Sequence, residues 1–260
     1  MQSRPHNQAS PRLLITGISG LIGGIAAPEL ARHYTVCGLD LEPAEGGFPT
    51  LEVDITDARV LLAAFRRFSP IRDVLHLAAD PRADAPWESV FKNNIQGTWN
   101  IFQAASRSGI RRVVLASSNH VTGTYEGVPP VLHKQPNPPR ISVMAPPRPD
   151  GPYGISKLTG EGIARYFHDH RGMEAVCLRI GSVLEEDPPE KDPRHRATWL
   201  SHRDLCHLLT RALLAGEAFP GFGIYYGVSE NTRRFWKLEN ARKELGFHPG
   251  DDAEQFYRGG

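Results

Sequence analysis

Short apolar segments alternate along the chain with longer amphipathic ones, and this alternation predicts the fold. The apolar segments are rich in branched side chains and end in glycine, aspartate or serine, as is typical of buried parallel strands. They cover residues 12–16, 35–39, 51–53, 73–77, 112–116 and 174–179. Helices are expected between them over residues 20–33, 57–68, 87–108 and 153–170. Such an alternation predicts an α/β protein with a doubly wound parallel sheet, covered by helices on both faces.

Two stretches depart from this alternation. The first eleven residues are polar and contain proline, so we expect a disordered tail over residues 1–11. Residues 124–150 are dense in proline, above all from residue 127 onward, and predict an inserted loop without regular structure. This proline-rich segment is either a passive insertion or a flap that covers a substrate.

Composition and charge exclude several classes of function. The 260 residues carry a net charge of +1, and no basic stripe suggests a nucleic-acid partner. We find neither an apolar run long enough to span a bilayer nor a signal peptide. Cys37, Cys177 and Cys206 lie in apolar surroundings, which predicts a reduced, cytoplasmic protein. The eleven histidines show no metal-binding spacing, so no metal is expected.

A glycine-rich stretch, TGISGLIG over residues 16–23, follows the first strand and opens a helix, which is the context of a dinucleotide-binding turn. Gly17 allows the tight turn, Gly20 lets backbone amides approach a pyrophosphate, and Gly23 permits close packing of the helix. The helix N-terminus also favours phosphates. The contacts expected from this turn are Gly17, Ser19, Gly20, Leu21, Ile22 and Gly23. The sheet is therefore predicted to be of the Rossmann type.

Two carboxylates indicate which dinucleotide binds. Asp40, followed by Leu41, closes the second strand about twenty residues after the turn, where a carboxylate can bind the adenosine ribose hydroxyls. It would repel the additional phosphate of NADP, so NAD is predicted. Asp54, followed by Ile55, ends the third strand and either accepts from the adenine amino group or serves as a turn residue.

A second group of residues predicts the chemistry. Tyr153 and Lys157 are four residues apart on one expected helix, so their side chains share a face. A nearby ammonium favours the phenolate and lowers the pKa of the phenol, which would make Tyr153 a usable base. Ser118 follows the fifth strand and meets the same edge of the sheet. With the glycine-rich turn, these residues predict hydride transfer with a nicotinamide cofactor.

These motifs give the chain a resemblance to the extended short-chain dehydrogenase/reductase superfamily, in its NAD-dependent epimerase/dehydratase family, from residue 13 to about residue 256. The stretches ASSNH (116–120), RPDG (148–151), LRIGS (178–182), TWLSH (198–202) and GVS (227–229) resemble the uronate dehydrogenases and related sugar dehydrogenases most closely. The resemblance implies NAD-dependent oxidation of a sugar at its anomeric hydroxyl. The sugar would be a hexuronate, which gives an aldarolactone, or a related aldose or sugar phosphate. A nucleotide-sugar epimerase or dehydratase that retains its NAD is the alternative, and a non-enzymatic nucleotide sensor is a second one.

The resemblance also implies roles for individual residues. Tyr153 would be the base, Lys157 its electrostatic partner and a ribose ligand, and Ser118 the hydroxyl that orients the sugar oxygen. The additional substrate contacts implied are Asn119, His120, Ser182 and Arg194. The additional cofactor contacts implied are Leu77, Ala78, Ala79, Asn94 and Ile180. Because an arginine fork suits a carboxylate or a phosphate equally, Arg194 indicates an anionic sugar, unless it is a solvated surface charge.

The chain departs from the uronate dehydrogenases on the substrate side. Those enzymes place a substrate-binding serine soon after strand four, where this chain has DPRAD over residues 80–84. Either Arg82 replaces that serine or the pocket accepts a different sugar. We divide the chain into the tail, an NAD-binding domain over residues 12–180 and a mostly substrate-binding region over 181–260. A homodimer through the helices at 87–108 and 153–170 is expected from the superfamily.

Overall fold

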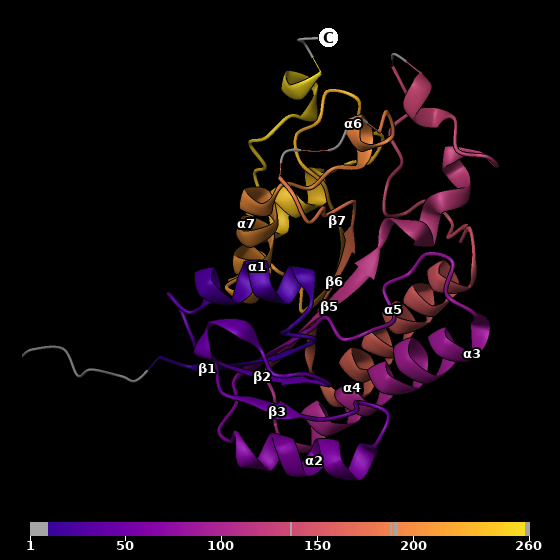
Figure 1. Cartoon of the computed structure of the whole chain (residues 1–260). Helices are drawn as coiled ribbons and strands as arrows, with labels where there is room; N and C mark the ends of the chain where they lie inside the picture. Colours follow the sequence, from indigo (N-terminus) through magenta and orange to yellow (C-terminus); the bar gives the residue numbers. More distant parts are fainter. Residues whose placement is uncertain (1–9, 136, 188, 190–191, 258–260) are drawn as a thin grey trace, which may run out of the picture.

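One sheet of seven parallel strands forms the centre of the molecule (Figure 1). The computed structural model describes residues 10–135, 137–187, 189 and 192–257, so most of the expected N-terminal tail lies outside the described residues. The strands run in the order β3-β2-β1-β4-β5-β6-β7. Their bounds are β1 (Arg12–Thr16), β2 (Thr35–Asp40), β3 (Thr50–Glu52), β4 (Asp73–His76), β5 (Arg112–Ser118), β6 (Glu174–Ile180) and β7 (Phe222–Gly227). The predicted α/β fold class is confirmed.

Helices cover both faces of this sheet, with α1 and α2 on opposite sides (Figure 1). On one face lie α1 (Leu21–Leu30) and α7 (His202–Leu213), whose apolar residues pack with Leu13 and Ile15 of β1. On the other lie α2 (Ala58–Arg67), α4 (Gly97–Arg107) and α5 (Pro152–Arg171), which pack with Leu14 of the same strand. Successive side chains of a strand point to opposite faces, so a continuous apolar strand supplies both cores.

The expected helix over residues 87–108 is built from three consecutive segments. These are α3 (Trp87–Ser89), the π-helical segment η2 (Val90–Gln96) and α4, and Gly109 follows with a φ of +67°. Asp57 caps α2, because its Oδ1 accepts hydrogen bonds from the backbone N–H groups of Arg59 and Val60. The remaining short helices are η1 (Glu45–Gly47), α6 (His195–Thr198), η5 (Ala241–Leu245) and η6 (Ala253–Phe256). None of the helices in the described part of the chain is long and apolar enough to cross a membrane.

The sheet continues past residue 180, which the sequence analysis did not anticipate. β7 pairs in parallel with β6 along its whole length, and α7 packs beside α1. β7 has the sequence FGIYYG, whose two glycines and two tyrosines do not form the apolar run that marks the other strands. The proposed boundary at residue 180 therefore does not end the sheet. That residues 181–260 mostly bind substrate stays a prediction.

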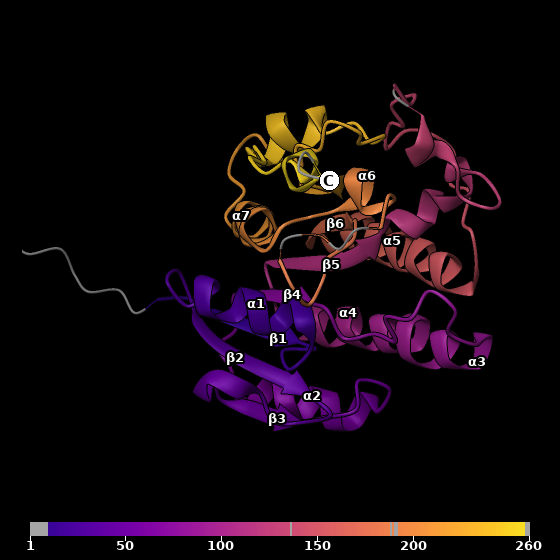
Figure 2. The same ribbon diagram turned by 45° about the horizontal axis from the view of Figure 1, so that its top comes forward.

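The proline-rich segment packs against the C-terminal part of the chain. It contains the end of the 3₁₀ segment η3 (Asn119–Glu126) and one further turn, η4 (Leu132–Lys134), and is otherwise irregular as expected. Ile141 forms an isolated bridge with Trp236, and Leu132 belongs to the same apolar cluster. Both segments lie above the strands in Figure 2. The segment thus covers one end of the molecule, next to the carboxyl ends of β5 and β6.

Candidate active site

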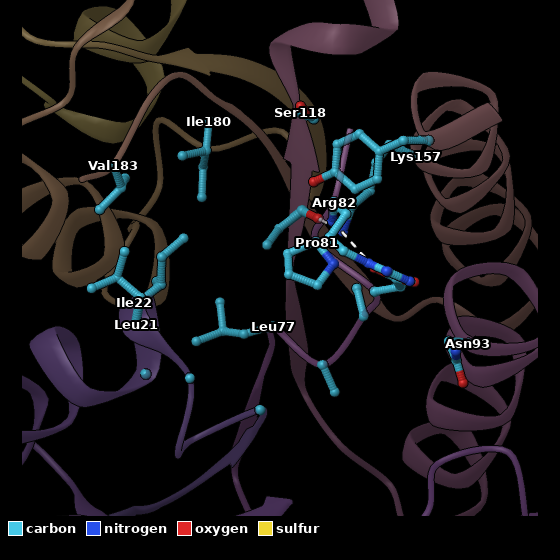
Figure 3. A pocket seen from close by; sticks show the side chains of 18 of the residues that line it. Leu21, Ile22, Leu77, Pro81, Arg82, Asn93, Ser118, Lys157, Ile180 and Val183 are labelled. Carbon is cyan, nitrogen blue, oxygen red and sulfur yellow. Dashed lines mark hydrogen bonds and ion pairs between the residues drawn. The ribbon is translucent and has the colours of Figure 1, made fainter. Parts of the chain in front are cut away.

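A cavity of about 900 Å³ opens at the carboxyl edge of the sheet, where the strand order reverses between β1 and β4. Ligands of doubly wound sheets bind at such a point. Most of the residues expected from the sequence line it (Figure 3): Gly17, Gly20, Leu21, Ile22, Gly23, Asp40, Leu41, Asp54, Ile55, Leu77, Ala78, Ala79, Ser118, Asn119, His120, Tyr153, Lys157, Ile180 and Ser182. Three expected residues, Ser19, Asn94 and Arg194, are not among the described residues of this lining.

The glycine-rich turn has the geometry that a pyrophosphate requires. Gly17 has a φ of +75°, and a Cβ there would lie 2.6 Å from the backbone nitrogen of Ala78. A Cβ on Gly23 would lie 2.4 Å from the carbonyl oxygen of Ile18. Helix α1 starts directly after Gly20, so its first-turn amides face the cavity without intrahelical acceptors. The turn therefore fits the phosphates of a dinucleotide.

Asp40 is fixed at the rim of the cavity by two backbone amides. Its Oδ2 accepts from Ser19 N at 2.8 Å, and its Oδ1 accepts from Leu41 N at 2.7 Å. Each carboxylate oxygen keeps further lone pairs that can accept from ribose hydroxyls. The hydroxyl of Ser19 donates to the carbonyl oxygen of Glu42, which explains why Ser19 lies outside the lining. Ser19 thus positions Asp40 through its backbone.

Asp54 serves as a turn residue and also faces the cavity. Its Oδ1 accepts from the backbone nitrogen of Thr56 at 2.8 Å, and Lys92 Nζ lies 3.9 Å from its Oδ2. Both interpretations of this carboxylate are therefore compatible with its position.

Asn94 lies behind the lining and connects two elements of the site. Its Oδ1 accepts from Asp80 N at 2.7 Å, while its Nδ2 donates to Asp80 O at 3.1 Å and to Ser156 Oγ at 3.0 Å. The loop after β4 is thereby attached to α5 close to Tyr153. The structure thus gives the amide of Asn94 this positioning role, and the expected contact with the cofactor stays a prediction.

The three expected catalytic side chains meet on one side of the cavity, where Figure 3 shows Ser118 and Lys157. The side chains of Ser118 and Tyr153 are hydrogen-bonded. Lys157 Nζ lies 5.5 Å from the centre of the Tyr153 ring and donates to Ala116 O at 2.9 Å. β5 supplies the serine and α5 supplies the other two residues, so packing of the helix against the strand assembles the group.

The electrostatics of this group differ from the expectation. Burial raises the pKa of Tyr153 to about 12; the hydrogen bond with Ser118 lowers this pKa in part, and the negative charge of Asp80 raises it further. Burial also lowers the pKa of Lys157 to about 8. The predicted lowering of the phenol pKa by Lys157 is therefore wrong for this structure, because loss of solvation dominates and raises the pKa of Tyr153.

The substrate side of the cavity contains a hydrogen-bonded pair that the sequence did not reveal. His120 Nδ1 lies 2.8 Å from Asp150 Oδ2, and the imidazole packs edge-on against the Tyr153 ring, with their centres 5.6 Å apart. A Cβ on Gly123 would lie 1.9 Å from the same Asp150 oxygen, so only glycine leaves room for this carboxylate. Asp150 belongs to the RPDG stretch, but its partner lies thirty residues away. The sequence therefore could not indicate the contact.

Asn119 offers a donor that needs a partner. Its side chain is buried in the lining, and its Nδ2 has no hydrogen-bond partner among the described residues. Its Oδ1 accepts from Ser118 Oγ at 3.3 Å. A buried amide donor without a partner is unfavourable unless a ligand satisfies it. Asn119 is therefore suited to bind an oxygen of the substrate, as expected.

Ser182 and Arg194 are both engaged by other residues. Ser182 lines the cavity, and its Oγ is 2.8 Å from Thr198 Oγ1. Arg194 forms a two-pronged ion pair with the buried Glu126, with Nε and Nη2 at 2.7 and 2.8 Å from the carboxylate oxygens. The neighbouring His195 lines the cavity instead, and the charged stretch around it gave no signal that distinguished it from Arg194.

The chain is similar to known proteins over most of its length. The model of the NAD-dependent epimerase/dehydratase family matches residues 13–208. An NAD-dependent glucose-6-phosphate dehydrogenase of Haloferax volcanii is 36% identical over 251 residues, covering 94% of this chain and 95% of the relative. A uronate dehydrogenase of Pseudomonas syringae pv. tomato is 35% identical over 257 residues, covering 96% and 86% of the two chains. The crystal structure of uronate dehydrogenase from Agrobacterium tumefaciens superposes with a TM-score of 0.82 at 32% identity and covers 96% and 88%. Because the family model and these relatives extend over most of its length, the chain belongs to the NAD-dependent epimerase/dehydratase family.

Proposed function

We propose that the protein oxidises a sugar at its anomeric hydroxyl with NAD as the oxidant. The observation that carries this proposal is the meeting of Ser118, Tyr153 and Lys157 in the same cavity as the glycine-rich turn and Asp40. Relatives along nearly the whole chain are NAD-dependent sugar dehydrogenases, which supports the same class of reaction. The substrate would be a hexuronate, an aldose or a sugar phosphate.

Each residue of the site has its own role in this proposed reaction. Ser118 and Tyr153, already hydrogen-bonded to each other, hold the anomeric hydroxyl between them. Tyr153 accepts the proton of that hydroxyl, and Lys157, on the same helix, would bind a ribose hydroxyl of the cofactor. Asn119 and His120 bind ring hydroxyls, and the bound NAD, when present, accepts the hydride. Oxidation thus moves one proton to the protein and two electrons to the cofactor.

Asp40 supports a preference for NAD over NADP. Its carboxylate lies just after β2, where it would repel the additional phosphate of NADP, and two backbone amides hold it there. We propose a cytoplasmic location, supported by the free state of Cys37, Cys177 and Cys206.

We propose a homodimer through α3, η2, α4 and α5, which the exposed aromatic residues on these elements support. Trp87, Phe91 and Trp99 on the first three elements and Tyr166 on α5 are each between 39% and 51% exposed. The Trp99 and Tyr166 rings lie 5.8 Å apart across α4 and α5. Adjacent exposed aromatic residues are typical of a protein interface. Analytical ultracentrifugation tests whether the protein is a dimer in solution.

The function is tested by measuring NADH absorbance with a panel of uronates, aldoses, sugar phosphates and nucleotide sugars. We expect NADH from a free sugar and none from nucleotide sugars. The substitution Tyr153→Phe should lower kcat by about 10²–10⁴-fold while NAD still binds, since it removes the base and keeps the ring. NAD that remains bound through turnover of a nucleotide sugar, with no net NADH, would instead identify an epimerase or dehydratase.

A further inference from the structure

We propose that Arg82, held in place by Asp80, binds the anionic group of the sugar and is the residue that selects a phosphate or carboxylate substrate. This inference rests on the proposed sugar oxidation. It assigns to the loop after β4 the role that the resemblance gave to Arg194.

Arg194 is held outside the described lining of the cavity by its partner. Glu126 is 2% exposed and takes two of the hydrogen bonds of the Arg194 fork. Moving the guanidinium to a substrate would leave this carboxylate buried without its counter-ion, which is strongly unfavourable. The pair Glu126–Arg194 therefore serves the fold of the segment next to the site.

Arg82 is open to a substrate and is fixed in orientation. It lines the cavity with its side chain 63% exposed. Its Nε lies 3.0 Å from Asp80 Oδ1 and its Nη2 lies 2.7 Å from Asp80 Oδ2. Asp80 in turn is 8% exposed and accepts from Ser89 Oγ. Because a guanidinium has five N–H donors and Asp80 takes two, three donors remain for an anion.

The loop that carries Arg82 is attached to the catalytic helix. Asn94 joins both backbone polar groups of Asp80 to Ser156 Oγ, and Ser156 Oγ donates to Tyr153 O at 2.7 Å. The charge of Asp80 also acts on Tyr153. Figure 3 shows Arg82 in the same cavity that Ser118 and Lys157 border. A sugar with its anomeric carbon at Tyr153 thus has Arg82 on the same side of the cavity for its distal group.

Phosphate and carboxylate share the chemistry that such an arginine recognises. Each presents two or more acceptor oxygens with negative charge to the planar donor fork. A neutral hydroxymethyl group at the same place offers neither the charge nor the second acceptor. The geometry therefore favours sugars with an anionic group over their neutral counterparts.

The experiment compares kcat/KM for glucose 6-phosphate, glucuronate and glucose in the unmodified protein and in the following variants. Arg82→Gln removes the proposed anion contact. This single change leaves Asp80 uncompensated near Tyr153 and so alters the proton transfer for every substrate. The double variant Asp80→Asn with Arg82→Gln removes both charges and keeps the shape of the pair. Arg203→Ala is the matched control, since Arg203 is an exposed arginine in a two-pronged pair with Asp251 outside the cavity.

The readout is the ratio of kcat/KM for the better anionic sugar to that for glucose, in which changes common to all substrates cancel. We expect this ratio to fall about ten- to a hundredfold in both Arg82 variants and to stay within about twofold in the control. The better anion, phosphate or carboxylate, identifies the physiological group.

Three results would overturn the assignment. One is an unchanged ratio in both Arg82 variants. Another is a preference of the unmodified protein for glucose over both anions, which would leave sugar oxidation standing. The third is a fall of the ratio as large as in the Arg82 variants when the double variant Arg194→Gln with Glu126→Gln is assayed. The melting temperature of this double variant shows whether it is folded. The absence of NADH from every sugar would reject the proposed function itself together with this inference.

Discussion

Glu161→Gln tests the buried ion pair that supports the catalytic strand. Glu161 and Arg179 are 3% and 2% exposed, and Arg179 donates to the two carboxylate oxygens through Nε and Nη2, each at 2.8 Å. Ser117, which precedes Ser118 in β5, donates to Glu161 Oε1 at 2.7 Å. The carboxylate therefore accepts three hydrogen bonds between α5, β5 and β6. Glutamine keeps its shape and removes its charge.

Exchanging one carboxylate oxygen of Glu161 for an amide nitrogen is expected to cause a large loss of stability. Removing one partner of a buried pair leaves the other charge uncompensated and costs about 3–5 kcal/mol in unfolding free energy. For a domain of this size, that corresponds to a fall in Tm of roughly 6–20 °C. Arg179 also donates to Tyr226 Oη at 3.3 Å, and this weaker contact cannot replace the carboxylate.

Calorimetry and urea unfolding measure this effect. The matched control is Asp169→Asn, on the same helix, whose carboxylate pairs with Arg165 at the surface. This control should leave Tm unchanged within error, since exposed pairs contribute little. The double variant Glu161→Met with Arg179→Met should recover most of the loss, because it buries no charge. A Glu161→Gln protein within about 1 kcal/mol of the unmodified one would refute this reasoning.

Three other substitutions test the site. Asp150→Asn should lower kcat/KM for the sugar about tenfold and leave the KM for NAD unchanged, because His120 loses a charged partner; an equal effect on both would contradict this role. Asp40→Ser should raise the ratio of kcat/KM for NADP to that for NAD about tenfold or more, since a repulsive carboxylate is removed; an unchanged ratio would show that Asp40 does not select the cofactor. Lys157→Met should remove a pH dependence of stability. Burial places the folded pKa of Lys157 at about 8, below its ordinary 10.5, so the unfolded chain binds more protons between these values. The unfolding free energy of the unmodified protein should then rise by roughly 3 kcal/mol between pH 8 and 10.5, and urea unfolding of the Met variant should lack this rise.

The sequence by itself determined most of the sheet, the glycine-rich turn and the pairing of Tyr153 with Lys157 on one helix. Its evidence was local: continuous apolar runs predict buried strands, and Gly17 and Gly23 of the glycine-rich turn occupy positions where a Cβ does not fit. The four-residue spacing of Tyr153 and Lys157 is also local, because one helix carries both. Patterns within one element survive folding, so they could be read directly. The sequence did not predict β7, because this strand is buried by its neighbours and does not itself carry a continuous apolar run.

Only the tertiary structure decided how the charged side chains are paired and which of them line the cavity. Glu126 closes the fork of Arg194 across 68 residues, and Asp150 meets His120 across thirty. The pKa of Tyr153 rises because packing removes water from the phenol, a quantity that sequence spacing does not contain. Electrostatic roles depend on distances and solvation between distant segments, and these are set only when the chain has folded.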